Sequence, residues 1–294
     1  MSGARRGPRV TATALVLGAC MALSGCSQDR DGRSPRPPAA PSSTAGTPRA
    51  VPAPPATAEE FLARARKAMN GEKGWTFAVR GREGLVLQGR ENAATYTATV
   101  RRTTGERWAL HSTGTTTSSK GVAEAEEIYV VDGTVHVRRG GPGAAWTRGP
   151  LTDPEQADRV EDPVAALDAF EEYGPGDVTP ARVDGRVELR VRTGPGALSA
   201  ARGRGVVEKA VRELRPTLRQ LRAAGVAAPE SAITVEYADE TLVLDPATHR
   251  ITSHTFRCAF RIPHGERTIR YEQQVTERTE GTYGADVTLP SQAR

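Results

Sequence analysis

Apolar and polar side chains alternate along the chain between residues 75 and 110. Residues 75–79 have a large side chain at every second position, and residues 94–100 repeat the pattern with threonines in between. Side chains two residues apart lie on one face of a β-strand. The pattern therefore predicts antiparallel strands with one apolar face, whose largest side chains are Trp75, Phe77, Tyr96, Val100, Trp108 and Leu110. These six are candidates to line a ligand cavity, and they suit a filled core equally well.

The residues before these strands have apolar side chains at helical spacing. Residues 57–60, Thr-Ala-Glu-Glu, have the sequence of a capping box, and apolar residues from Phe61 to Met69 share one helical face before Gly71. A tight hairpin is predicted at residues 128–137, because an Asp-Gly pair between two apolar runs is typical of a type I′ turn.

The second half of the chain mixes helical and strand patterns. Short helices are expected at residues 154–159 and 163–172, and a long helix at residues 198–224 with a kink at Pro216. The expected strands are residues 186–192, 232–237, 241–244, 251–262, 267–276 and 283–289, with a turn at residues 245–250. This order of elements predicts the α+β class: one strongly curved antiparallel sheet, an incomplete barrel, with helices packed on one face.

The first 25 residues are typical of a secretory signal peptide. Three arginines precede an apolar stretch at residues 10–23, which is too short to cross a bilayer as a mature helix. The next residues, Leu23-Ser24-Gly25-Cys26, resemble the lipobox of bacterial lipoproteins, in which the cysteine is lipidated and becomes the N-terminus. We therefore expect a signal peptide at residues 1–25, an acylated Cys26, and anchoring to the extracytoplasmic face of the cell membrane.

Residues 26–57 are expected to form a disordered tether. Eight of the 21 prolines, and no aromatic residue, lie between residues 27 and 57. Such a segment cannot bury a core, and it would reach about 30 Å as a flexible coil or about 95 Å in a polyproline conformation. Residues 58–294 are then expected to form a single domain.

Composition excludes several classes of protein. The chain has 40 basic and 35 acidic residues; without the three leader arginines the net charge is +2, which argues against a nucleic-acid binder. Three cysteines and five histidines show no metal-ligand spacing, so neither a metal site nor a cofactor is expected.

Candidate catalytic groups are few. No nucleophile elbow or paired-carboxylate motif occurs. His254 and Cys258 share a strand face with Phe256 and Phe260, which favours a buried, unreactive thiol over a catalytic pair. The glutamates at residues 124–127 and 171–172 are expected to be solvated. The sequence therefore predicts a protein that is not an enzyme.

Arginines recur on one side of the predicted long helix, at Arg212, Arg215, Arg219 and Arg222. Such a row is suited to anionic lipid headgroups, at a membrane or at the mouth of a cavity. It equally forms a solvated helix face among neighbouring glutamates, the interpretation that the charge pattern favours.

The sequence resembles the LolA-like superfamily, and within it the LppX and LprG type of lipid-binding lipoproteins. The resemblance spans residues 57–290 and rests on the lipobox, the helix before the first strand, the hairpin leading to Trp146, the Asp245-Pro turn and the closing residues 283–290. In that family an incomplete barrel, with helices over its open side, holds acyl chains in a hydrophobic cavity. This chain departs from the family in its longer, arginine-rich helix and its few aromatic residues.

Two functions are compatible with these patterns. One is a membrane-anchored module that binds a lipid or another apolar ligand in a half-barrel cavity and transfers it across the cell envelope without making or breaking a bond. The other is a non-enzymatic envelope sensor or scaffold that binds a protein partner through the sheet or its edge strands.

Overall fold

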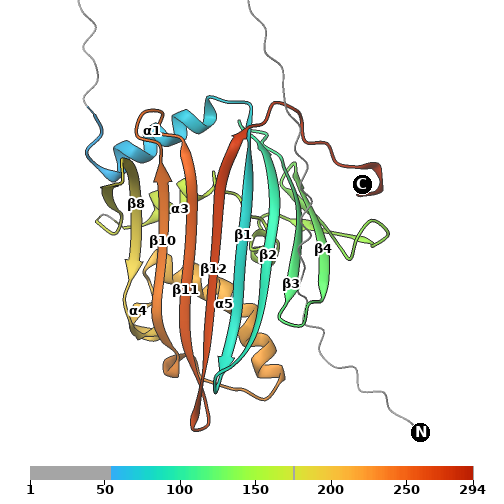
Figure 1. Cartoon of the computed structure of the whole chain (residues 1–294), viewed down its shortest axis with the longest axis vertical. Coiled ribbons are helices and arrows are strands. Elements are labelled where there is room, and N and C mark those ends of the chain that lie inside the picture. The colour runs from blue at the N-terminus through green and yellow to red at the C-terminus, as the bar shows by residue number, and fades with distance from the viewer. Residues whose placement is uncertain (1–53, 175, 294) are drawn as a thin grey trace, which may run out of the picture. The chain divides into compact units, whose positions relative to one another are not determined.

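The computed structural model describes residues 54–174 and 176–293. The predicted leader, Cys26 and the tether up to residue 53 lie outside these residues. In the described part, twelve strands form one antiparallel sheet in the order β6-β5-β4-β3-β2-β1-β12-β11-β10-β8-β7, with the short β9 beside β10 (Figure 1). The sheet is open, because β6 and β7 are its two edges. The predicted α+β class with a curved antiparallel sheet is confirmed.

The first six strands form a meander in which each strand pairs with the next. They are β1 Gly74–Leu87, β2 Arg90–Thr103, β3 Leu110–Ser118, β4 Ala123–Val131, β5 Thr134–Arg139 and β6 Trp146–Pro150. The turn between β4 and β5 confirms the predicted hairpin, since Asp132 and Gly133 have φ angles of 48° and 69°.

The other six strands extend the sheet on the far side of β1. They are β7 Thr179–Val183, β8 Arg186–Thr193, β9 Gly196–Ala197, β10 Thr234–Leu244, β11 Ile251–His264 and β12 Arg267–Thr282. Because β12 pairs with β1 along its length, the first and last strands are neighbours at the centre of the sheet.

The helices are α1 Ala58–Asn70, α2 Pro154–Ala157, α3 Ala166–Glu172, α4 Leu198–Ala201 and α5 Gly205–Ala223, with 3₁₀ turns at Glu230–Ala232 and Ser291–Ala293. The predicted capping box begins α1: the Thr57 side chain accepts a hydrogen bond from the Glu60 N–H, and the Glu60 carboxylate accepts one from the Thr57 N–H. In Figure 1, α3 and α5 lie behind the strands, over one face of the sheet. We call this covered face the inner face, and the opposite one the outer face.

Four details of the secondary-structure prediction are wrong. The helix expected at residues 198–224 is divided into α4 and α5, because Gly203 between them has a φ of +87°. The strands expected at residues 232–237 and 241–244 are one strand, β10, with a bulge between Val235 and Tyr237. Residues 283–289 form no strand, since β1 is already paired on both sides where Tyr283 leaves the sheet. β7 has no counterpart in the prediction.

A hydrophobic core fills the inner face near α1. Phe77, Val100 and Leu110 are fully buried there and belong to the same cluster as Phe61 and Met69 of α1. The indole N–H of Trp75 donates a hydrogen bond to the Met69 carbonyl oxygen at 2.8 Å. This end of the inner face is therefore closed by α1.

Candidate functional site

The inner face changes from apolar to polar along strands β1 and β2. Phe77 lies opposite Val100, and both are fully buried. Four residues further along β1, Gly81 lies opposite Tyr96, which in turn lies opposite Thr116 of β3. A cavity begins at this second row.

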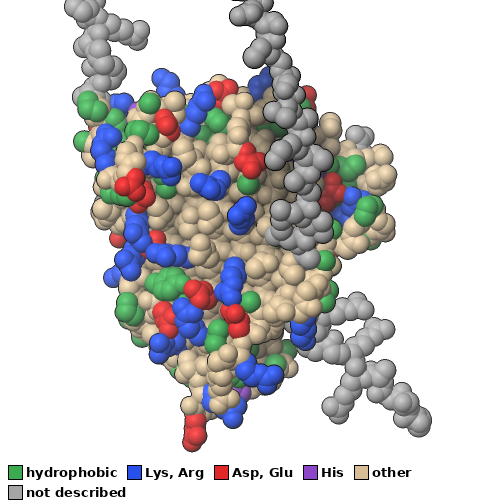
Figure 2. All heavy atoms as spheres, in the orientation of Figure 1, with side chains coloured by type: hydrophobic (Ala, Val, Ile, Leu, Met, Phe, Trp, Pro, Cys, Tyr) green, Lys and Arg blue, Asp and Glu red, His purple; other side chains and the backbone are tan. Residues whose placement is uncertain are grey.

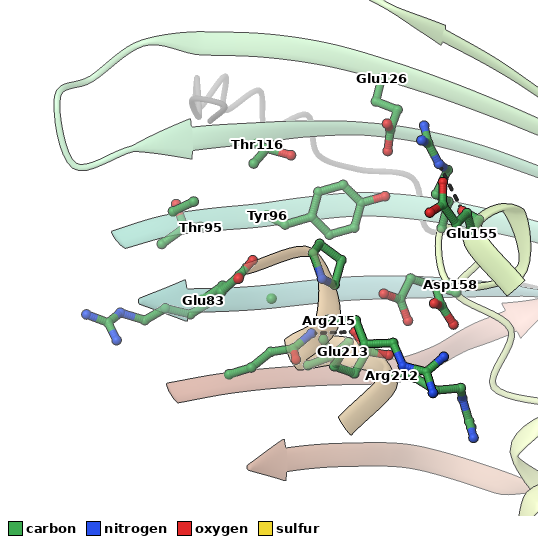
Figure 3. Close-up of a pocket in the computed structure, with 18 of the residues that line it drawn as sticks. Glu83, Thr95, Tyr96, Thr116, Glu126, Glu155, Asp158, Arg212, Glu213 and Arg215 are labelled. Atoms are coloured by element: carbon green, nitrogen blue, oxygen red, sulfur yellow. Dashed lines mark hydrogen bonds between the residues drawn. The ribbon is translucent and has the colours of Figure 1, made fainter. Parts of the chain in front are cut away.

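The cavity has a volume of about 590 Å³ and lies between the inner face of the sheet, α2 with the residues after it, and α5 (Figure 3). Glu83, Tyr96, Thr116 and Glu126 face it from the strands in Figure 3, while Glu155 and Asp158, and on α5 Arg212, Glu213 and Arg215, face it from the helices. Its volume is within the range of about 300–1,000 Å³ typical of pockets for small molecules.

The ring of Tyr96 is the largest apolar surface of the cavity wall. It lies across β3 at Gly114, where a Cβ atom would come within 2.8 Å of the ring, so a residue without a side chain is needed there. Val275, opposite Gly81 on β12, and Ala94, opposite Glu83 on β2, extend the apolar wall. Burial raises the pKa of Tyr96 well above its ordinary value, so the hydroxyl group keeps its proton and can donate a hydrogen bond.

Charged side chains enter the cavity from the helix side. Arg219 of α5 forms an ion pair with Glu155 at 3.1 Å, whereas Arg212 and Arg215 form no ion pair within the described residues. Burial raises the pKa of Asp158, and the nearby Arg212 and Arg215 partly offset this rise. The helix side thus offers guanidinium groups that a ligand can reach.

Two glutamates of the cavity have raised pKa values. Burial, together with the nearby carboxylates of Glu277 and Glu213, raises the pKa of Glu161 to about 8. Burial also raises the pKa of Glu213, although its carboxylate accepts a hydrogen bond from Gln273 Nε2 at 2.9 Å. Glu161 is therefore largely protonated at neutral pH, and the cavity is less acidic than its composition indicates.

Close to Glu161, the inner face contains a buried ionic cluster, which we define as Lys209, Glu240, His254 and Glu277. His254 lies between two carboxylates, with Nε2 at 2.7 Å from Glu240 and Nδ1 at 2.5 Å from Glu277. Lys209 of α5 donates to Glu240 at 2.6 Å. Glu240 is 0% exposed and Glu277 is 2% exposed. The cluster therefore ties α5 to three central strands, and Tyr173, next to α3, donates to Glu240 as well.

The charge states of the cluster follow from these contacts. Burial by itself lowers the pKa of His254, but its hydrogen bonds to Glu240 and Glu277 outweigh burial and raise the pKa to about 9. For Glu240, burial raises the pKa, and the nearby Lys209 and His254 outweigh it and hold the pKa well below its usual range. His254 is thus a cation at neutral pH, beside an ionised Glu240.

The structure separates the sequence-predicted cavity residues. Tyr96 lines the cavity, whereas Trp75, Phe77, Val100 and Leu110 are buried in the hydrophobic core to which α1 also contributes. Trp108, partly buried just before β3, packs under the guanidinium of Arg102 at 4.6 Å.

The arginine row of the long helix is divided in the same way. Arg212, Arg215 and Arg219 line the cavity beside Tyr96, and Arg222 does not. The charge pattern favoured a solvated helix face for this row, but in the structure three of its arginines line a cavity.

Two interpretations of charged residues need correction. The face shared by His254 and Cys258 is buried as expected, but His254 has two carboxylate partners there instead of an apolar environment. The Glu126 side chain is only 13% exposed, pairs with Arg139 and lines the cavity, so it is not a solvated charge. Glu240 and Glu277 lie just beyond the strands expected at residues 241–244 and 267–276, and continuing the alternation of those strands assigns both to the inner face.

No helix within residues 54–174 and 176–293 is long and apolar enough to cross a membrane. In the same residues, no group of three or more metal-ligating side chains is arranged to hold an ion.

Comparisons with known proteins give only distant similarities. No protein-family model matches the chain, and no curated protein matches its sequence. Among solved structures, it is similar to a protein described as an outer membrane lipoprotein-sorting domain from Vibrio parahaemolyticus, with 12% identity and a TM-score of 0.30 over 78% of this chain and 95% of that one. A LolA superfamily protein from Nitrosomonas europaea has 10% identity and a TM-score of 0.28 over 80% and 96% of the two chains. A DUF1329 family protein from Desulfovibrio piger has 6% identity and a TM-score of 0.27 over 76% and 92%. The protein from Nitrosomonas europaea is described by the name of the superfamily that the sequence resembles.

Proposed function

We propose that this protein is a lipoprotein, anchored at Cys26 to the extracytoplasmic face of the cell membrane, that holds a lipid or another amphiphile in the cavity beneath α5. The observation that carries the proposal is the cavity itself, which is on the inner face and combines an apolar wall with charged groups. Binding by burial needs no bond to form or break, and each Å² of apolar ligand surface removed from water contributes about 25 cal/mol.

An amphiphile fits the lining better than a wholly apolar molecule does. The apolar part of the ligand lies against Tyr96, Ala94 and Val275 on the strand side. An anionic headgroup lies at Arg212 and Arg215, which have no ion pair of their own within the described residues. Guanidinium groups bind carboxylate and phosphate oxygens through paired hydrogen bonds.

Helix α5 is suited to act as the movable cover. Its first half is held by buried Val207, Val211 and Leu214, whereas Arg215 and Pro216 are exposed. Pro216 has no N–H to donate to the carbonyl group four residues earlier, so the helix is weakest where the cavity begins. Movement of the second half, which breaks the hydrogen bond from the buried Thr217 to Glu83 at 2.7 Å, opens the cavity while the first half stays on the core.

The experiment is mass spectrometry of lipids extracted from purified protein that starts at Ser27. Removing the leader and Cys26 leaves the core intact, because the buried apolar residues of the described part lie between Pro55 and Ala293. We expect one amphiphile per chain, and its loss in Thr116→Trp, where the indole fills the cavity.

The matched control is Thr115→Trp, since Thr115 is the next residue of β3 and faces the outer side. It should keep the bound amphiphile. Absence of any bound amphiphile, or equal loss in both variants, would contradict the proposal, and capture of an envelope protein in its place would favour the sensor or scaffold.

The anchor is tested separately in the full-length chain. Cys26→Ala should leave the membrane fraction or remain an unprocessed precursor, with the urea midpoint of the folded part unchanged. A Cys26→Ala protein that is still processed and labelled by a fatty-acid probe would contradict the anchor, whatever the cavity binds.

A further inference from the structure

The outer face of the sheet is rich in arginines, most of which have carboxylate partners. Figure 2 shows basic side chains spread over this face, with fewer acidic ones. Arg190 and Arg257 both donate to Asp239, which is 2% exposed. Arg261 and Arg270 both donate to Glu236. Charge on this face is therefore mostly compensated within the protein.

Some arginines of the same face have no carboxylate partner, and three of these lie together. Arg80, Arg186 and Arg278 form no ion pair or side-chain hydrogen bond within residues 54–174 and 176–293, yet they line one pocket of about 550 Å³. The pairing register explains why two of them are close: Ala78 lies opposite Arg278, and Arg80 lies opposite Thr276. Arg80 and Arg278 are thus diagonal neighbours across β1 and β12, about 7–8 Å apart at the backbone.

The acidic groups of the pocket form no ion pair with these arginines within the described residues. The Asp245 carboxylate is engaged by its own turn, where it accepts hydrogen bonds from the Thr248 N–H at 2.7 Å and the Ala247 N–H at 3.1 Å. Glu280 lines the pocket but is exposed and forms no ion pair with the three arginines. Hydroxyl groups complete the lining, and that of Ser253, directly opposite Arg278 on β11, has no hydrogen bond to another described residue.

We propose that Arg80, Arg186 and Arg278, with the Ser253 hydroxyl, bind a phosphate-type oxyanion on the outer face. Like charges gathered without carboxylate partners are compensated when an anion binds among them, and guanidinium and hydroxyl donors match the oxygens of such an anion. The site is on the face opposite to the cavity and does not depend on the cavity's ligand.

The test measures binding of inorganic phosphate by calorimetry, and binding to vesicles of phosphatidylglycerol or phosphatidylcholine by co-sedimentation, for the chain starting at Ser27. The two probes distinguish a soluble phosphate from a lipid headgroup. We expect Arg278→Gln and Arg80→Gln each to weaken binding of the responding probe at least tenfold. Glu280→Gln should strengthen it, because one negative charge leaves the pocket rim.

The control is Arg261→Gln, which removes one positive charge from the same face but from an arginine already paired with Glu236. It should change affinity less than twofold. The proposal is overturned if neither phosphate nor phosphatidylglycerol binds, or if Arg261→Gln weakens binding as much as Arg278→Gln, since the attraction would then come from the whole face. An unchanged far-UV spectrum of each variant shows that a loss is not due to unfolding.

Discussion

The two ends of the inner face are built from the same strands and differ in what covers them. At one end, Trp75 of β1 donates a hydrogen bond to Met69 of α1, and the space holds buried apolar side chains that include Phe77 and Val100. At the other end, α5 and α2 stand over Gly81, Tyr96 and Thr116, and a cavity of about 590 Å³ remains. The alternation of side chains along a strand thus determines which of them face inward. The helix above the strand determines whether these side chains contact other side chains or line a cavity.

The largest contrast between the two ends is expected in stability. Phe77→Ala should lower the free energy of unfolding by about 3–5 kcal/mol, because it leaves a void in a closed core. Thr116→Ala at the open end should lower it by less than about 1 kcal/mol. Urea denaturation of both variants measures the difference, and equal losses would show that the two ends are packed alike.

Substitution in the buried ionic cluster should lower stability by an amount similar to substitution at the closed end, even though the residues of the cluster are polar. Glu240→Gln removes the carboxylate shared by Lys209, His254 and Tyr173, so we expect a loss of about 3 kcal/mol. Glu188→Gln, on the strand next to β10 and facing outward, is the control, with a change below about 0.5 kcal/mol. A loss in Glu240→Gln as small as in the control would mean that the cluster does not hold α5 to the sheet.

The pH dependence of the free energy of unfolding should distinguish the contribution of His254 in the cluster from that of Glu161 in the cavity. The pKa of His254 is about 9 in the fold and about 6.5 when unfolded, so its contribution is complete below pH 6.5 and is lost as pH rises through 9. We expect His254 to contribute a decrease of about 2 kcal/mol between pH 7 and 9, and His254→Gln removes this contribution. The pKa of Glu161 is also raised, to about 8, so its part of the decrease falls between about pH 4.5 and 8, and Glu161→Gln removes that part. A flat profile above pH 7 in the unchanged protein would contradict the charged His254.

The smallest effects are expected from two glycines that flank Tyr96. A Cβ atom at Gly114 would lie 2.8 Å from the Tyr96 ring, so Gly114→Ala must displace the ring and should lower stability by about 1–2 kcal/mol. At Gly81 the nearest atom would be 3.4 Å away, and Gly81→Ala should be neutral or stabilising by up to about 1 kcal/mol. Thermal unfolding compares the two, and a reversed order would show that Tyr96 does not lie across β3.

Short sequence patterns predicted most of the helices, strands and turns, because these depend mainly on residues that are neighbours in the chain. The capping box at residues 57–60 and the Asp132-Gly133 turn involve only neighbouring residues, and both are present. The division of the long helix at Gly203 depends instead on a backbone φ of +87° that a helical pattern does not reveal. The same limit applies to the site: Tyr96 belongs to the same alternation as Phe77, and no local signal shows that one meets a cavity and the other a core.

The sequence by itself determined the α+β class, the antiparallel strands and the side of each strand that faces inward. These features follow from the spacing of apolar side chains and from the residues of the turns, which are properties of neighbouring residues. Only the tertiary structure decided that Glu240, His254 and Glu277 meet, since their strands are brought together by a register that includes the bulge of β10. It also decided that Arg212 and Arg215 face Tyr96, which depends on where α5 lies over the sheet. Contacts between residues far apart in the chain follow from packing, which the pattern of a single segment does not contain.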